Sequence, residues 1–185
     1  MRTRPLWRTL IDALVFLCVL VLVLAALQKF GVLDIQQGTV TVIDGDSLRE
    51  GQIEIRLYGI DAPEYRQTCL DEFRQDYSCG KRAAEELRSL VAQGDVKCRS
   101  LDIDRYGRAV STCVVGDIDI AHAMVERGWA VAFIQYGSDY VPAEILAHKA
   151  KRGLWAGDFE LPSDYRKRMH KLQSNVVGAE TVEPD

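Results

Sequence analysis

A long apolar segment near the N-terminus sets the first limit on how this chain can fold. Residues 10–27 are apolar except for one aspartate, and Arg2, Arg4 and Arg8 precede them. These 18 residues, if helical, rise about 27 Å, which is close to the hydrocarbon thickness of a bilayer. Arginines beside such a segment stay on the cytoplasmic side. The pattern therefore predicts a single transmembrane signal-anchor, with the chain that follows it exported.

A cleaved signal peptide is the alternative interpretation of the same segment. It requires a shorter apolar region and small residues before the cut, and Val23-Leu24-Ala25 could serve there. The length of the apolar region favours the uncleaved anchor. The anchor places the domain on the periplasmic or extracellular side of the cytoplasmic (inner) membrane, whereas cleavage would release it. Both interpretations predict export.

The exported part is acidic overall. The whole chain has 23 Lys and Arg and 27 Asp and Glu; without the three arginines and one aspartate of residues 1–28, it keeps 20 and 26, a net charge of −6. This excludes a protein with a generally basic surface. A nucleic acid would have to bind to a local basic cluster, with a metal ion adding positive charge.

The cysteines indicate an oxidising compartment. Four of the five lie in the exported part, at Cys69, Cys79, Cys98 and Cys113, and an even number predicts two disulfides. The fifth, Cys18, lies in the apolar segment as a small apolar residue. A zinc site is the other interpretation, but the chain has no CxxC pair and none of its three histidines is spaced near a cysteine.

Alternation and turn residues indicate a mixed α and β domain. Apolar and polar residues alternate at 39–43 and 53–58, with turns at 44–46 and 50–51; helices are expected at 81–93, 118–127 and 142–151, and strands at 95–101 and 109–115. In the strand at 53–58, Arg56 is expected on the face opposite the aliphatic residues. The order of elements suits an α+β fold with a partly open five-stranded barrel of OB type and about three helices.

The cysteine pairs fit this arrangement. Cys98 and Cys113 are nearly symmetric about the turn at 104–107, so they would face each other across a hairpin. Cys69 and Cys79 would close the loop at 65–79. The expected organisation is a basic cytoplasmic N-terminus (1–9), the signal-anchor (10–28), a connector (29–37), the OB-type domain (38–160) and a basic, then acidic, mobile tail (161–185).

Three short segments concentrate unusual polar residues. They are Ile43-Asp44-Gly45-Asp46, Arg56-Leu57 leading into Asp61-Ala62-Pro63-Glu64, and Asp104-Arg105-Tyr106-Gly107-Arg108. Each alone is compatible with an ordinary surface turn. Together and in this order, they resemble the thermonuclease family, whose best-known member is staphylococcal nuclease. The resemblance extends from about Thr39 to Trp155.

The resemblance implies a calcium-dependent site. Asp46 and Asp61 would bind Ca²⁺ through their carboxylates and Ala62 through its main-chain carbonyl, where family members often have a hydroxyl residue. Arg56 and Arg108 would bind the scissile phosphate, and Glu64 would act on the attacking water. Two carboxylates and a carbonyl are hard oxygen ligands that suit Ca²⁺, and two guanidinium groups offset the charge that phosphodiester hydrolysis builds on the phosphate oxygens.

Four further residues are expected to contact substrate by the same resemblance. Arg105 and Tyr106 would line the phosphate and sugar side of the groove. Phe133 and Tyr136 are candidates for stacking against a base, although Phe133 could equally be a core residue.

The resulting expectation is an exported endonuclease. By resemblance it would hydrolyse the phosphodiester bonds of DNA and RNA with little sequence preference, act fastest on single strands, leave 3′-phosphates and work as a monomer. A non-catalytic module that binds nucleic acid or protein in the cell envelope is the alternative, since one fold serves several functions.

Overall fold

The computed structural model describes residues 7, 14–21 and 40–180, with side chains to residue 174. The chain separates into two compact units, residues 1–38 and 39–185. In the first unit, residues 14–21 are helical. The other parts of the predicted N-terminus, signal-anchor and connector lie outside the described residues. Within the described ranges, no helix has the length and apolar character needed to cross a membrane.

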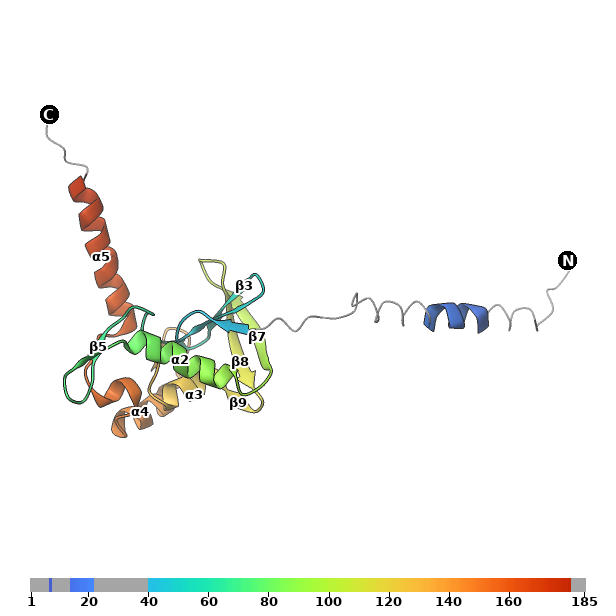
Figure 1. Cartoon of the computed structure of the whole chain (residues 1–185), viewed down its shortest axis with the longest axis horizontal. Helices are drawn as coiled ribbons and strands as arrows, with labels where there is room; N and C mark the ends of the chain where they lie inside the picture. The colour runs from blue at the N-terminus through green and yellow to red at the C-terminus, as the bar shows by residue number, and fades with distance from the viewer. Residues whose placement is uncertain (1–6, 8–13, 22–39, 181–185) are drawn as a thin grey trace, which may run out of the picture. The chain divides into compact units, whose positions relative to one another are not determined.

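The second unit is built on one mixed sheet (Figure 1). Its main strands are β1 (Val40–Val42), β2 (Ser47–Glu50), β3 (Ile53–Leu57), β8 (Ala109–Val115) and β7 (Val96–Ile103), paired in that order. All neighbours are antiparallel except β3 and β8, which are parallel. Five strands with this parallel contact form an OB-like α+β fold, as predicted.

Short strands complete the framework around this sheet. β9 (Ile118–Asp119) pairs with β8, β10 (Val131–Ala132) with β4 (Ile60–Asp61), and β6 (Asp76–Tyr77) with β5 (Cys69–Leu70). Residues 118–119 were expected to begin a helix and instead form β9, because they pair with the end of β8 across the turn at Gly116. β4 carries Asp61, one of the residues predicted to bind Ca²⁺.

The helices are α2 (Cys79–Val91), α3 (Ile120–Glu126), α4 (Val141–Lys149), the 3₁₀ helix η1 (Gly153–Ala156) and α5 (Pro162–Glu180). Of these, α2 and α3 pack against the sheet and α4 packs against α3, and together they enclose the core. The buried face of α2 includes Ala83, Leu87 and Leu90, at the helical spacing that predicted it. These side chains belong to one buried cluster with Leu48 and Leu57 of the sheet. The core therefore lies under the strands that carry the site.

Both expected disulfides are present. Cys98 and Cys113 are direct partners in the register of β7 and β8, with their Cα atoms 4.1 Å apart. Cys69 and Cys79 join the β5–β6 hairpin to the start of α2, with Cα atoms 5.6 Å apart. The hairpin prediction from symmetric spacing is confirmed.

Removing the Cys98–Cys113 bridge is expected to destabilise the domain. The bridge closes a loop of 15 residues, so a Cys98→Ala/Cys113→Ala variant should lose about 3 kcal/mol of unfolding free energy in the chain-entropy model. Urea unfolding followed by circular dichroism measures this loss. Cys18→Ser is the control, because Cys18 is a free cysteine. A loss below about 1 kcal/mol in the double variant would contradict the prediction.

The C-terminal segment differs from the mobile tail expected there. Residues 162–180 form helix α5, the longest helix of this unit, which projects from the domain (Figure 1). Pro162 stands at its first position and Asp164 in its first turn, both favourable there because a proline lacks a backbone N–H to satisfy and an acidic group opposes the helix dipole. The first turns of the helix lie beside Asp61 of β4.

Candidate functional site

The turn between β1 and β2 presents Asp46 from a tightly packed backbone. The Asp46 N–H donates to Asp44 Oδ1 at 3.0 Å, and the Ser47 hydroxyl donates to Asp46 Oδ1 at 3.0 Å. A Cβ at Gly45 would lie 2.7 Å from the Ala62 Cβ and 2.8 Å from the Ala83 Cβ. Only glycine therefore lets this turn press against α2 and bring Asp46 beside the segment that follows β4.

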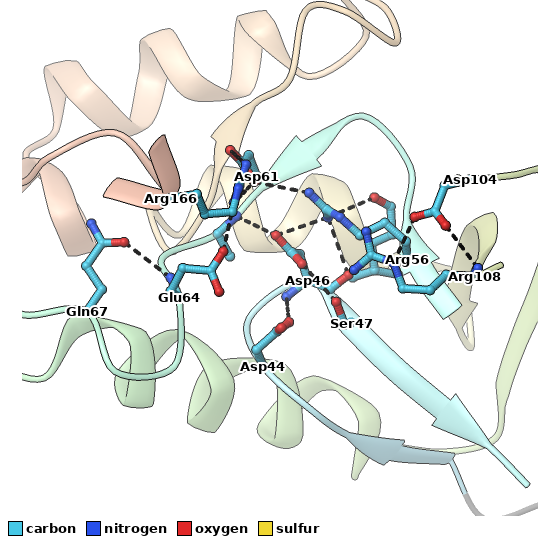
Figure 2. Close-up of polar contacts among 12 residues, drawn as sticks. Asp44, Asp46, Ser47, Arg56, Asp61, Glu64, Gln67, Asp104, Arg108 and Arg166 are labelled. Carbon is cyan, nitrogen blue, oxygen red and sulfur yellow. Dashed lines mark hydrogen bonds and ion pairs between the residues drawn. The ribbon is translucent and has the colours of Figure 1, made fainter. Parts of the chain in front are cut away.

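Arg56 lies buried between the two aspartates that were predicted to bind metal (Figure 2). Its Nη1 is 3.0 Å from Asp46 Oδ2 and its Nη2 is 3.1 Å from Asp61 Oδ1. The three residues are 8%, 6% and 1% exposed, in the order Arg56, Asp46 and Asp61. Arg56 does lie opposite the aliphatic residues of β3, but that face is covered rather than solvated, because the two carboxylates close over it.

Glu64 is held by its backbone while its carboxylate reaches the surface. Its N–H donates to Gln67 Oε1 at 3.2 Å, and its carbonyl accepts from the Gln67 N–H at 2.7 Å. A Cβ at Gly80 would overlap the Glu64 carbonyl oxygen at 1.8 Å, so glycine is required where α2 begins. The side chain of Glu64 is 36% exposed. A fixed backbone with an accessible carboxylate suits a group that meets a water molecule.

Arg166 of α5 joins these carboxylates, and sequence analysis did not predict it. Its guanidinium donates from Nη1 to Asp61 Oδ1 at 3.0 Å, from Nη2 to Asp61 Oδ2 at 2.9 Å, and from Nη1 to Glu64 Oε1 at 2.9 Å (Figure 2). The basic run 166–168 was visible in the sequence, but no spacing relates it to Asp61, which is 105 residues away. The proline and aspartate that begin α5 were the one available sign of a helix there.

Gln67 is a second unpredicted residue of the site. It is 0% exposed, and its Nε2 donates to the Glu160 carbonyl at 2.7 Å. With its bonds to Glu64 it ties the loop that follows β4 to the residues just before α5. Buried glutamine in a loop has no sequence signature, so only the folded chain identifies this role.

Burial and mutual charge alter the acidity of the carboxylates. Burial raises the pKa of Asp61, an effect opposed by the hydrogen bonds and charge of Arg166. Burial and the neighbouring charge of Asp46 raise the pKa of Asp44 to about 6. Burial also opposes the charge of Arg166, but its bonds to Asp61 and Glu64 outweigh this and raise its pKa. The carboxylates of Asp46, Asp61 and Glu64 therefore lie close together, and Arg56 and Arg166 offset their negative charge.

The hairpin turn before β8 positions Arg108. Asp104 Oδ1 accepts from the N–H groups of Tyr106 at 2.9 Å and Arg108 at 3.0 Å, and its Oδ2 accepts from Arg108 Nε at 2.8 Å. Burial would raise the pKa of Asp104, but these bonds from Arg108 and Tyr106 outweigh it and hold the pKa below its ordinary value. The Nε of Arg108 is thus anchored while its side chain, 27% exposed, faces the groove.

A groove of about 840 Å³ brings the predicted residues together. Its lining comprises Asp44, Asp46, Glu54, Arg56, Glu64, Asp102, Ile103, Asp104, Arg105, Tyr106, Arg108, Phe133, Gln135, Tyr136 and Arg166. Asp61 and Ala62 do not line it; they are buried directly behind, with the Ala62 N–H donating to Asp46 Oδ2 at 2.7 Å. One wall therefore carries arginines and carboxylates in contact.

The opposite part of the groove is aromatic. The ring centroids of Phe133 and Tyr136 are 5.3 Å apart, and Tyr58 lies 5.6 Å from Tyr136. Arg105 stacks over the Tyr106 ring at 4.9 Å. Phe133 lies half-buried on the groove wall, so it is not a residue of the main core. Exposed rings beside guanidinium groups are a surface on which bases and phosphates can bind together.

The donor set at the carboxylates fits a hard cation. Asp46 and Asp61 supply carboxylate oxygens close to the Ala62 backbone, and Asp46 Oδ1 accepts only from Ser47 among the hydrogen bonds of the described residues. Oxygen ligands of this kind suit Ca²⁺ rather than zinc or copper. Over the described part of the chain, no three His, Cys, Asp or Glu side chains converge as a metal cluster.

Comparison with known proteins identifies relatives over more than half of the chain. A family model described as staphylococcal nuclease homologue matches residues 54–157. A succinoglycan biosynthesis protein, ExoI, of Rhizobium meliloti is 40% identical over 121 residues, which cover 64% of this chain and 63% of that protein. The chain thus spans less than two thirds of that relative.

Two bacterial relatives carry the name uncharacterized endonuclease. The protein of Escherichia coli is 33% identical over 136 residues, covering 70% of this chain and 82% of the relative. The protein of Haemophilus influenzae is 31% identical over 137 residues, covering 70% and 71%.

Proposed function

Because this chain belongs to the family of staphylococcal nuclease homologues, we propose that it is a Ca²⁺-dependent nuclease that hydrolyses phosphodiester bonds in DNA and RNA. One observation carries the proposal: Arg56, Glu64 and Arg108 line the same groove as Asp46, and Arg56 joins Asp46 to the buried Asp61. A family member that had lost catalysis would have little reason to keep five charged groups so close, since buried charges are costly unless they serve a purpose.

Each charged group has a distinct role in this proposal. Arg56 and Arg108 bind the scissile phosphate and hold it while charge builds on its oxygens. Lysine would be a poor substitute for either, because it cannot offer paired donors in a fixed plane. Glu64 accepts a proton from the attacking water, which its exposed carboxylate can reach. Asp46, Asp61 and the Ala62 carbonyl would hold Ca²⁺, which supplies positive charge to the phosphate.

The rest of the groove favours a flexible strand as substrate. Arg105 and Tyr106 lie on the side of Arg108, and Phe133 with Tyr136 offers rings to unstacked bases. Ring stacking tolerates any base, so little sequence preference is expected, and a single strand exposes its bases more readily than a duplex. Products ending in 3′-phosphates and a monomeric enzyme complete the proposal.

We also propose that the protein works outside the cytoplasm, tethered by residues 10–28. The arginine-flanked apolar segment supports the tether, and the two disulfides support an oxidising compartment. Residues 1–9 would then be cytoplasmic, 29–37 a connector and 38–160 the catalytic domain. Release after cleavage near Ala25 is the alternative.

A non-catalytic envelope module is the second candidate. The acidic balance of the exported part favours it, since proteins that bind polyanions are usually basic, and the relative ExoI carries the name of a biosynthesis protein rather than a nuclease. This candidate predicts chelator-independent binding to nucleic acid or protein without cleavage.

Removal of metal is expected to decide between the two candidates. The full chain in a mild detergent should cleave single-stranded DNA and RNA with Ca²⁺ and lose at least about 10²-fold in rate with excess chelator, because the cation offsets transition-state charge. Product length on denaturing gels measures cleavage. Activity that survives chelation would overturn the metal mechanism, and binding without cleavage in Ca²⁺ would favour the envelope module.

A further inference from the structure

Arg166 covers the carboxylate of Asp61, which a cation would have to approach, and also bonds Glu64. Its planar guanidinium bonds both oxygens of Asp61 and one oxygen of Glu64 at 2.9 to 3.0 Å (Figure 2). Asp61 Oδ1 also accepts from Arg56. Asp61 is therefore neutralised from two sides, and its side chain is only 2% exposed.

A divalent cation and Arg166 compete for Asp61 in this arrangement. The bidentate contact uses one lone pair on each carboxylate oxygen, and Arg56 uses the second on Oδ1, which leaves one lone pair on Oδ2. A metal bound there would stand beside the Arg166 guanidinium, which has the same sign of charge. Because like charges at such distances repel in a partly buried site, binding of the metal weakens the contact of Arg166 with Asp61, and that contact weakens binding of the metal.

Arg166 is the cation that can leave. Its side chain is 42% exposed, whereas that of Arg56 is 10% exposed. The start of α5 is held by other contacts: Gln67 bonds the Glu160 carbonyl at 2.7 Å, and Arg168 bonds the Glu160 carboxylate at 2.8 Å. The Arg166 side chain could thus rotate toward the groove, which it already lines, without the helix leaving the domain.

We propose that Arg166 is an internal counter-cation that competes with Ca²⁺ for Asp61, while its second bond holds Glu64 beside that carboxylate. The first turns of α5 thereby cover the cation site and set the Ca²⁺ concentration at which it fills. This inference rests on the proposed metal site. Arg166 lies beyond the matched family segment, which ends at residue 157.

Calcium titration of the full chain in mild detergent, without nucleic acid, tests the competition. Isothermal titration calorimetry should show that Arg166→Gln binds Ca²⁺ about tenfold more tightly than the wild type, because the site no longer has to release a bound charge. Arg166→Lys should fall between the two, since lysine keeps the charge but lacks the fork. Lys167→Gln is the matched control on the same helix, because Lys167 pairs with Asp164 at the surface, and it should bind Ca²⁺ like the wild type.

A second measurement checks that each variant is folded. Melting curves are recorded in the presence of chelator for this purpose. If Arg166→Gln is unfolded, the Ca²⁺ affinity of Arg166→Lys is compared with that of the wild type instead. The rise in melting temperature on adding saturating Ca²⁺ should be larger for Arg166→Gln than for the wild type, because ligand stabilisation grows with affinity.

The outcomes separate this inference from the function on which it rests. Equal or weaker Ca²⁺ binding by Arg166→Gln, with clear binding by the wild type, overturns the competition and leaves the metal site standing. Weaker binding would instead make Arg166 a support for the ligand carboxylates. No Ca²⁺ binding by either protein overturns the metal site and the competition together.

Discussion

Replacing Glu64 by glutamine is expected to reduce phosphodiester cleavage by at least about 10²- to 10³-fold while leaving the fold intact, because the amide cannot accept a proton from the attacking water. The change is nearly isosteric, and the backbone bonds between Glu64 and Gln67 remain. A glutamine oxygen can still accept from Arg166. Loss of activity should therefore come from chemistry rather than from unfolding.

Initial rates on single-stranded DNA at saturating Ca²⁺ measure the effect of Glu64→Gln. Glu85→Gln is the matched control: the same chemical change on the exposed side of α2, outside the groove. Melting temperatures of both variants should lie close to that of the wild type. A Glu64→Gln protein that keeps more than about a tenth of the wild-type rate would show that another group or the metal alone activates the water.

Replacing Arg56 by methionine is expected to lower both the stability and the activity of the protein strongly. Methionine fills a similar volume but leaves Asp46 and Asp61 buried without the guanidinium that joins them. Removing one partner of a buried ion pair typically costs 3 to 5 kcal/mol, so we expect a loss of about 3 kcal/mol here, at the lower end because Arg166 still pairs with Asp61. Cleavage should also be lost, since Arg56 lines the groove.

Urea unfolding of the metal-free protein measures this loss. Arg49→Met on the neighbouring strand is the control, because Arg49 pairs with Glu54 at the surface, where both side chains are 50% and 42% exposed; it should cost less than about 1 kcal/mol. A similarly small loss for Arg56→Met would mean that Asp46 and Asp61 are stable without their common partner, contrary to the site described above.

Three local segments, and the family resemblance that their order carries, were sufficient for most of the site. Asp44 to Asp46 and Asp104 to Arg108 lie in turns and Asp61 to Glu64 ends strand β4, and such residues are selected by backbone conformation over a few positions. The spacing of Cys98 and Cys113 about such a turn was enough to predict their bridge, since two strands joined by a short turn must lie in register. Features that depend on residues close together in the chain could therefore be predicted from the sequence.

Contacts between distant segments were decided only by the folded chain. Arg56 was placed on the correct face of its strand, but its burial depends on Asp46 and Asp61, which β2 and β4 bring over it. Phe133 reaches the groove because β10 pairs with β4, a contact that no local pattern marks. Packing of this kind depends on the whole arrangement of elements, since each side chain is covered by residues far away in sequence.

The sequence by itself thus determined the type of domain and the two disulfides, because periodicity, turn chemistry and cysteine spacing act locally. The family resemblance added most of the residues from which the groove is made. Tertiary structure alone decided how those residues meet. It placed Gln67 beneath Glu64 and brought Arg166 of α5 onto Asp61 and Glu64. A guanidinium can bond any accessible carboxylate, so only the path of the chain after residue 157 selects these two.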